Sequence, residues 1–227
     1  MPIRAILFDL DGTLIDQFEA IHRAFVRVLT QMGFPEPSFE SVKRSVGGAS
    51  ETTMTKLIGA DRAKEAVRLL RPIFEEEMLD GLKALPGSHE ILESCKAHGL
   101  KTAVLTNKHG PHARAACDHL HFSEFLAFTL GANDTDWKKP DPRLTNYALE
   151  KIGARAEETL YLGDSPYDYD TASEVGMKCL LVATGTHSLS ELKKLSATSV
   201  DQNLFDVAEK TLPSLLSRAN RFEGRMT

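Results

Sequence analysis

Short apolar runs that alternate with helical patterns are the feature that most constrains the fold of this chain. These runs are apolar at successive positions, as expected of parallel strands buried on both faces; a strand with one wet face would alternate. The runs are residues 4–9, 101–106, 125–131, 158–164 and 177–184. Alternating strands and helices predict an α/β fold, a doubly wound (Rossmann-like) parallel sheet with right-handed crossovers.

Helix signals fill the segments between these runs. Ser188 and Glu191 have the spacing of a capping box, and Gly99 follows a helical pattern as a C-terminal cap. Residues 141–153 also have helical spacing and end at a glycine. Their expected apolar face consists of Leu144, Tyr147, Ala148 and Ile152.

One stretch, residues 16–85, interrupts the alternation. It has no visible strand pattern, and its apolar residues recur at helical spacing from Phe18 onward. Pro86 and Gly87 mark the return to the sheet. We therefore predict a catalytic core made of residues 1–15 and 86–227, with a small helical cap domain, residues 16–85, inserted after the first strand.

Composition and charge limit the classes of function. The chain has 227 residues, with 27 basic and 32 acidic side chains and a net charge of −5, and its Lys and Arg residues are not clustered. Nucleic acid and anionic membrane are therefore not expected as partners. Apolar runs are too short to cross a bilayer or to form a signal peptide. Three scattered cysteines indicate reduced thiols, so we expect a cytoplasmic protein. As a separate expectation, the protein is a monomer or a homodimer.

Asp9 and Asp11, in the stretch ILFDLDGTLID, are the first candidates for chemistry. Asp11-Gly12 is also typical of a β-hairpin turn, but a helical pattern follows Thr13 where a hairpin needs a second strand. At the end of a strand, residues i and i+2 point the same way, so both carboxylates can face one pocket. Two unpaired carboxylates ~4 Å apart repel by about 4 kcal/mol at an effective dielectric constant of about 20. Such a pair therefore needs a cation or a shared proton.

Polar residues also follow two of the other predicted strands. Thr106 and Asn107 end the second strand, where a helix cap is the alternative interpretation. Lys138 and Lys139 stand before Pro140, which fixes the local backbone and can hold a lysine in place. Two solvated lysines would give the same pattern, so neither segment identifies a site by itself.

Asp164 and Asp168 follow a further strand, one helical turn apart. Ser165 and Pro166 have the pattern of a helix start, in which Asp168 would be the third helical residue. A helix start explains Asp168 without any function. It leaves unexplained why Asp164 stands at yet another strand end.

Together these groups form one coherent set, because the carboxyl ends of parallel strands meet at one edge of the sheet. The set comprises four acids and three donors to an anion: Asp9, Asp11, Asp164 and Asp168, with Thr106, Asn107 and Lys139. Mg²⁺ favours carboxylates, water and substrate phosphate as ligands. Metal ligands, anion donors and a free carboxylate indicate phosphoryl transfer with Mg²⁺ as the cofactor.

The motifs DLDGT, TN, KPDP and GDSxxD, in this order, resemble the haloacid dehalogenase superfamily of phosphohydrolases. The likeness extends from Ile6 to about Gly185, interrupted by the helical stretch. TNK, KPDP and VATG are similar to its phosphoglycolate phosphatase-like branch, which carries a helical cap. The resemblance implies a Mg²⁺-dependent phosphatase that acts on a small phosphorylated metabolite, such as a phosphoglycolate-like compound or a sugar phosphate.

The resemblance also implies roles for the acids. Asp9 would be the nucleophile that forms an aspartyl-phosphate, and Asp11 the general acid and then the general base. The metal would bind the carboxylates of Asp9 and Asp164 and the carbonyl of Asp11. Asp168 would lie close to the metal or act through a water.

The donors receive roles in the same way. Thr106 and the backbone N–H of Asn107 would bind phosphoryl oxygens. Lys139, which directly precedes the proline of KPDP, would neutralise charge in preference to Lys138. Asp11 argues against the dehalogenase and phosphonatase branches of the superfamily, which lack this second acid.

The predicted cap domain is where this family selects its substrate. In KRSVGGAS, residues 43–50, Gly47 and Gly48 permit close backbone approach, and Arg44 could bind a carboxylate or a second phosphate. The alternative is a glycine hinge beside a solvated arginine.

Other functions share these motifs. A phosphomutase of the β-phosphoglucomutase type would differ in its cap contacts, and pyrophosphate is a further candidate substrate. A non-catalytic binding protein would be expected to lack at least one key group, whereas all of them are present.

Overall fold

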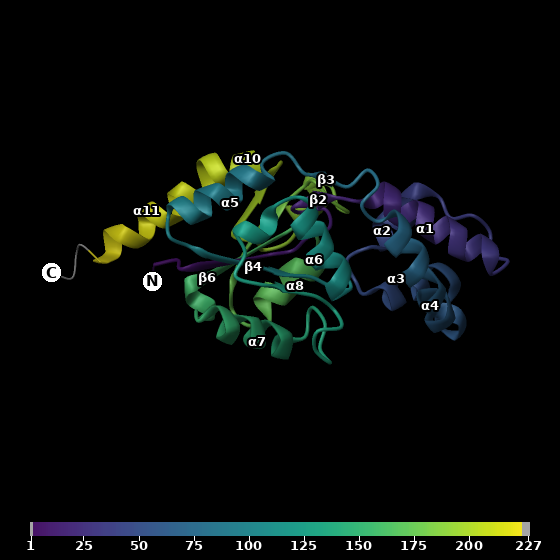
Figure 1. Cartoon of the computed structure of the whole chain (residues 1–227). Helices are drawn as coiled ribbons and strands as arrows, with labels where there is room; N and C mark the ends of the chain where they lie inside the picture. The colour runs from purple at the N-terminus through teal and green to yellow at the C-terminus, as the bar shows by residue number, and fades with distance from the viewer. Residues whose placement is uncertain (1, 224–227) are drawn as a thin grey trace.

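The computed structural model shows a sheet flanked by helices, with a further group of helices beyond one end (Figure 1). It describes residues 2–223, with side chains as far as residue 217. Six strands in these residues form one parallel sheet in the order β5-β4-β1-β6-β7-β8. They are β1 (Ala5–Phe8), β4 (Lys101–Leu105), β5 (Thr129–Leu130), β6 (Thr159–Gly163), β7 (Lys178–Val182) and β8 (Ser199–Asp201). The predicted α/β fold with a parallel sheet is confirmed.

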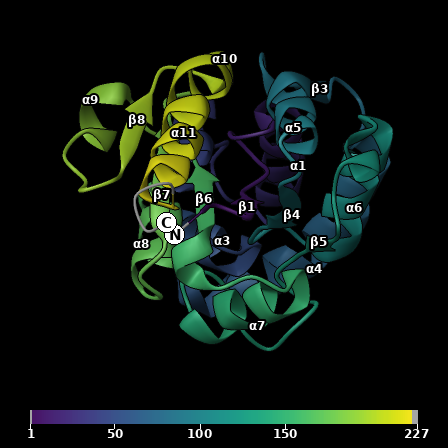
Figure 2. The ribbon, with the colours of Figure 1, turned by 90° about the vertical axis from the view of Figure 1, so that its left-hand side faces the viewer.

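Helices cover both faces of the sheet, as the continuous apolar runs require (Figures 1 and 2). In β1, Ile6 and Phe8 pack on one face and Ala5 and Leu7 on the other, and all four are fully buried. The first face is covered by α5 (Ser88–Ala97), α6 (Gly110–His119), α10 (Leu204–Asp206) and α11 (Leu212–Glu223). The second is covered by α7 (Pro142–Ile152), α8 (Pro166–Ser173) and α9 (Leu189–Leu192). Single turns complete the core: η1 (Phe122–Glu124), η2 (Ala156–Glu158) and η3 (Val207–Thr211).

The helix signals are confirmed with one exception. The capping box of Ser188 and Glu191 is formed, and Gly99 is left-handed after α5. Tyr147, predicted on the apolar face of α7, is instead 41% exposed. Leu149 takes part in the buried face in its place, because that face follows the row centred on Leu144 and Ala148.

The prediction that residues 16–85 contain no strand is wrong at both ends. β2 (Ile15–Asp16) and β3 (Lys83–Ala84) pair antiparallel and join the core to the helices between them (Figure 1). Strands of two residues are too short to show any periodicity. The turn at Asp11 and Gly12 therefore does precede a strand, but that strand pairs with β3 rather than with β1.

The four helices between β2 and β3, here called the helical insert, have an apolar cluster of their own. Phe25, Val28, Met54 and Phe74 are among its buried members. The helices are α1 (Phe18–Gln31), α2 (Phe39–Ser45), α3 (Ser50–Ile58) and α4 (Ala60–Glu77). This separate cluster supports the division into core and cap, which we keep as a proposal. The last residues of the predicted core, 224–227, lie outside the described part of the chain.

Within residues 2–223, no helix combines the length and the apolar character needed to cross a membrane.

Candidate active site

The candidate site lies where the central strands end and the core faces the helical insert (Figure 1). β1 lies between β4 and β6, with Phe8 level with Val104 and Leu162. Residues that directly follow these three strands are therefore brought together. The side chains of Asp9, Thr106 and Asp164 are all buried there, although polar side chains are seldom buried without a partner.

Three acids form a compact cluster at this edge. Asp9, Asp164 and Asp168 each offer a carboxylate oxygen, and these oxygens all lie within 4.8 Å of one another. Burial raises the pKa of Asp9 to about 6, although Lys139 opposes the shift. Burial, with Asp168 and Asp9 as neighbouring negative charges, also raises the pKa of Asp164 well above its ordinary value. A divalent cation would offset the burial and the mutual repulsion that disfavour the ionised carboxylates. The all-oxygen set fits Mg²⁺.

Lys139 is the cation that the protein itself supplies to this cluster. Its Nζ lies 2.7 Å from Asp9 Oδ1, 2.7 Å from Asp168 Oδ1 and 3.1 Å from the Tyr161 hydroxyl. Burial disfavours its charge, but Asp168 and Asp9 raise the pKa of Lys139 well above its ordinary value, so it stays protonated. Its neighbour Lys138 is exposed at the wall of the adjoining cavity.

Asn107 holds the backbone of Lys139 in place. Its Oδ1 accepts a hydrogen bond from Lys139 N at 2.9 Å, and its Nδ2 donates to Lys139 O at 3.1 Å. The same Nδ2 donates to the carbonyl of Gly47 in the helical insert, also at 3.1 Å. The Asn107 side chain thus fixes a lysine of the site and ties the insert to the core.

Asp168 has a structural role and a place in the site at the same time. The expected helix start is confirmed, because Oδ2 of Asp168 accepts from Ser165 N at 3.0 Å and Ser165 Oγ at 2.7 Å. It also accepts from Asp164 N at 3.1 Å, while Oδ1 faces Lys139. The helix cap therefore positions the carboxylate instead of competing with the site for it.

Asp164 is held by Thr186, a residue that was not predicted to take part in the site. Its Oδ2 accepts from Thr186 N at 2.7 Å and from Thr186 Oγ1 at 3.0 Å. Gly185 makes this approach possible, because a Cβ at that position would lie 2.0 Å from Asp164 Oδ2. The motif VATG hinted at this loop, but only the fold brings it to Asp164.

Two further residues of the site were missed. Lys108 Nζ contacts Asp11 Oδ1 at 3.0 Å and Oδ2 at 3.1 Å. Tyr161, in the middle of β6, donates its hydroxyl to Leu105 O at 2.7 Å and faces Lys139. Lys108 follows Thr106 and Asn107 directly and could have been found from that position. Tyr161 carries no signal in an otherwise apolar strand.

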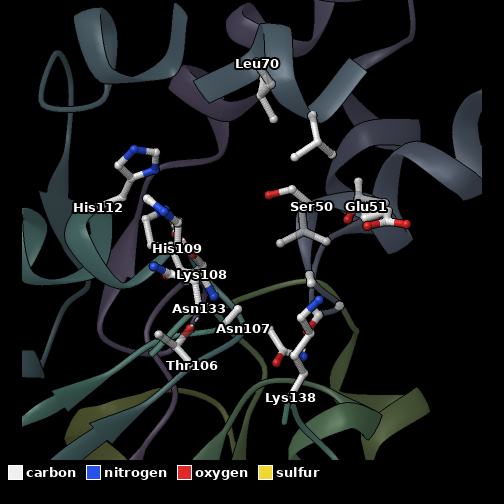
Figure 3. A pocket seen from close by; sticks show the side chains of 18 of the residues that line it. Ser50, Glu51, Leu70, Thr106, Asn107, Lys108, His109, His112, Asn133 and Lys138 are labelled. Atoms are coloured by element: carbon white, nitrogen blue, oxygen red, sulfur yellow. Dashed lines mark hydrogen bonds and ion pairs between the residues drawn. The ribbon is translucent and has the colours of Figure 1, made fainter. Parts of the chain in front are cut away.

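A cavity of about 400 Å³ separates this cluster from the helical insert. Thr106 and Asn107 lie at its base and Leu70 projects from the opposite side, with His109 and Ser50 on facing walls (Figure 3). Asp9, Asp11 and Gly48 also line it. Among the residues predicted to act here, Arg44 and the more deeply buried Lys139, Asp164 and Asp168 are not part of the lining.

Arg44 is bound at the edge of the core instead. Its guanidinium donates to Glu191 Oε1 at 2.7 Å and to Thr186 O at 2.7 Å. This pairing lowers the pKa of Glu191 to about 2, with hydrogen bonds from Ser188 contributing. The structure thus places Arg44 as a link between the insert and the loop that holds Asp164.

Comparison with known proteins agrees with the geometry. The family model described as haloacid dehalogenase-like hydrolase matches residues 6–182. A phosphoglycolate phosphatase of Aquifex aeolicus is 31% identical over 183 residues, covering 81% of this chain and 86% of that protein. One from Photorhabdus laumondii is 28% identical over 221 residues, covering 94% of each. The crystal structure of a hydrolase from Pseudomonas syringae has the same fold, with a TM-score of 0.80 at 24% identity over 92% of this chain and 97% of that one.

These matches confirm the resemblance predicted from the motifs, and with it the prediction of an enzyme. The family match covers the three acids of the buried cluster and both lysines that contact acids of the site. The chain belongs to the haloacid dehalogenase-like hydrolase family.

Proposed function

We propose that this enzyme is a Mg²⁺-dependent phosphatase that hydrolyses a small phosphorylated metabolite through an aspartyl-phosphate intermediate. The observation that carries the proposal is the Asp9 carboxylate, held 2.7 Å from the Lys139 ammonium beside two more buried acids at the base of a cavity. The relatives that are named phosphoglycolate phosphatases support a phosphate ester as the substrate.

In the first step, an Asp9 oxygen attacks phosphorus. A bond forms between that oxygen and phosphorus, and the bond from phosphorus to the ester oxygen breaks. Asp11 gives its proton to the departing alcohol. Lys139 offsets the negative charge that Asp9 and the phosphoryl group bring together.

In the second step, water attacks the phosphorus of the aspartyl-phosphate while Asp11 takes its proton, which releases Asp9 and inorganic phosphate. Thr106 is set up to bind a phosphoryl oxygen throughout. Its Oγ1 accepts a hydrogen bond from Lys108 N at 3.2 Å, so its own proton is free to point to the substrate.

Asp9 and Asp164 are our proposed carboxylate ligands for Mg²⁺, with the Asp11 carbonyl. Both oxygens of Asp168 already accept hydrogen bonds, which favours a role through water for this residue. When bound, the metal supplies positive charge against the phosphate dianion. The donor set fits the ion, because three buried carboxylates, once ionised, carry more negative charge than the single ammonium of Lys139 among them can balance.

We further propose the helical insert as the cap that closes over the substrate. Gly48 lines the cavity and is a candidate for direct contact. Arg44 can contribute only by exchanging Glu191 for a group of the substrate.

A screen of phosphorylated metabolites for phosphate release, with and without Mg²⁺, tests the function. We expect free phosphate that depends on the metal. An isomerised sugar phosphate without net release would instead identify a mutase, and no turnover of any compound would contradict an enzymatic role.

A further inference from the structure

We propose that the substrate is the phosphate monoester of an alcohol with a sizeable apolar part, considerably larger than glycolate. This inference rests on the proposed phosphatase activity and names its substrate class. It is carried by the side of the cavity that faces the catalytic acids.

That side belongs to the helical insert and is mostly apolar, with Glu51 and Arg71 as its charged residues. Leu70 is 6% exposed and projects into the cavity opposite Thr106 and Asn107 (Figure 3). The apolar roof, as we call this surface, consists of Ile21, Phe25, Val67, Leu70 and Phe74. A polar two-carbon ester bound to Asp9 and Thr106 would leave most of this roof without a partner.

Two histidines stand on the wall beside the roof, and Lys108 and Arg71 line the same cavity. Burial lowers the pKa of His109 and of His112, so both rings are neutral at pH 7. His109 Nδ1 is buried without a hydrogen-bond partner in the described structure, and His112 Nε2 pairs with Glu75 at 3.0 Å. A neutral imidazole suits a hydroxyl or carbonyl group of the substrate better than a carboxylate.

The volume of the cavity also suits a substrate larger than phosphoglycolate. Its volume of about 400 Å³ lies in the range of sites that enclose drug-sized ligands, about 300–1,000 Å³. Apolar surface gains binding energy only where the substrate covers it, at roughly a fourfold change in affinity per buried methylene. An alcohol that reaches the roof is therefore the better substrate.

Straight-chain alkyl phosphates from ethyl to hexyl test this inference. Their alcohols have similar pKa values, so chain length changes contact with the roof while the chemistry stays the same. With Mg²⁺ present, we expect kcat/KM for phosphate release to rise about fourfold per methylene until the cavity is filled, and to exceed the value for phosphoglycolate. Equal or falling kcat/KM along the series would overturn the inference while leaving the phosphatase proposal intact. Failure of every ester to release phosphate would contradict the phosphatase proposal itself.

Two matched variants locate the effect. Leu70→Ala should lower the ratio of hexyl to ethyl kcat/KM at least fivefold. Leu69→Ala is the same change one residue earlier in α4, at a position outside the cavity lining, and should leave the ratio unchanged. Val67→Thr keeps the side-chain volume at a half-buried position of the roof but makes it polar. If Leu70→Ala folds poorly, this variant should lower the same ratio and so provides a second test. The same ratio in all three variants would show that the roof does not contact the alcohol.

Discussion

The Lys108 ammonium lies 3.0 and 3.1 Å from the two carboxylate oxygens of Asp11, and 4.9 Å from the ring centre of Phe74 in the helical insert. The Lys108 and Asp11 side chains are only 6% and 12% exposed, so water screens the pair weakly. One side chain thus connects the proposed general acid of the core with a helix of the insert. We infer that Lys108 positions Asp11, and that the position of the insert influences this contact.

Lys108→Met should lower kcat about 10- to 100-fold, because Asp11 loses the group that aims its carboxylate, and small misplacements are costly. Lys108→Arg should recover part of the loss. Steady-state kinetics of the double variant with Asp11→Asn checks whether Lys108 acts through Asp11. In that background Lys108→Met should cost little, and a full additional loss would show an independent role.

Asp9→Asn should reduce turnover below detection while the protein still folds, because an amide cannot act as the nucleophile but still fits the site. Phosphate release and a thermal melt measure the two effects. Asp170→Asn, the same change at an exposed position of α8, is the matched control and should keep full activity. An active Asp9→Asn enzyme would refute the assignment of the nucleophile.

Chelation should abolish turnover, and Mg²⁺ should restore it and raise the melting temperature.

The affinity for Mg²⁺ should depend on pH in a defined direction. The pKa of Asp9 is about 6 without metal, so below pH 6 the proton must leave before the metal binds. We expect the Kd to rise as the pH falls below 6, by about tenfold per pH unit for the Asp9 proton and more steeply where Asp164, whose pKa is also raised, takes up a proton as well. Titration with Mg²⁺ at pH 5, 6 and 7.5 tests this, and a Kd that does not change with pH would exclude Asp9 as a ligand.

Tyr161→Phe should lower the free energy of unfolding by about 1–3 kcal/mol, because Leu105 O loses its hydrogen bond in a buried setting. Tyr147→Phe is the matched control, since Tyr147 is 41% exposed, and should change stability by less than about 0.5 kcal/mol. Denaturant unfolding compares the two variants. Equal stabilities would mean that the Tyr161 hydroxyl does not support the site.

Arg44→Ala and Glu191→Gln together decide what Arg44 does. If Arg44 serves only to link the insert to the core, both substitutions should leave KM unchanged, and Arg44→Ala, which also removes the bond to Thr186 O, should have the larger effect on kcat. If Arg44 also binds substrate, Arg44→Ala alone should raise KM. Kinetics of the two single variants on the same ester separates these outcomes.

The α/β class followed from the sequence by itself, because strands buried on both faces need continuous apolar runs and these are visible locally. The positions of Asp9, Thr106 and Asp164 could also be predicted from the sequence, since each is the last residue of such a run and parallel strands end at one edge. The helix start at Ser165 was equally readable, because its cap lies within four residues. The two-residue strands β2 and β3 were missed because they are too short for a period.

The tertiary structure decided which side chains meet. Asp11 and Lys108 are 97 residues apart in the chain, and Asp9 and Lys139 are 130 apart, so no local pattern encodes either distance. The burial of Tyr161 beside Lys139, and the pairing of Arg44 with Glu191, depend on how helices and strands pack. Local periodicity sets which residues face inward, whereas the contacts among those residues arise only when the sheet and the helical insert come together.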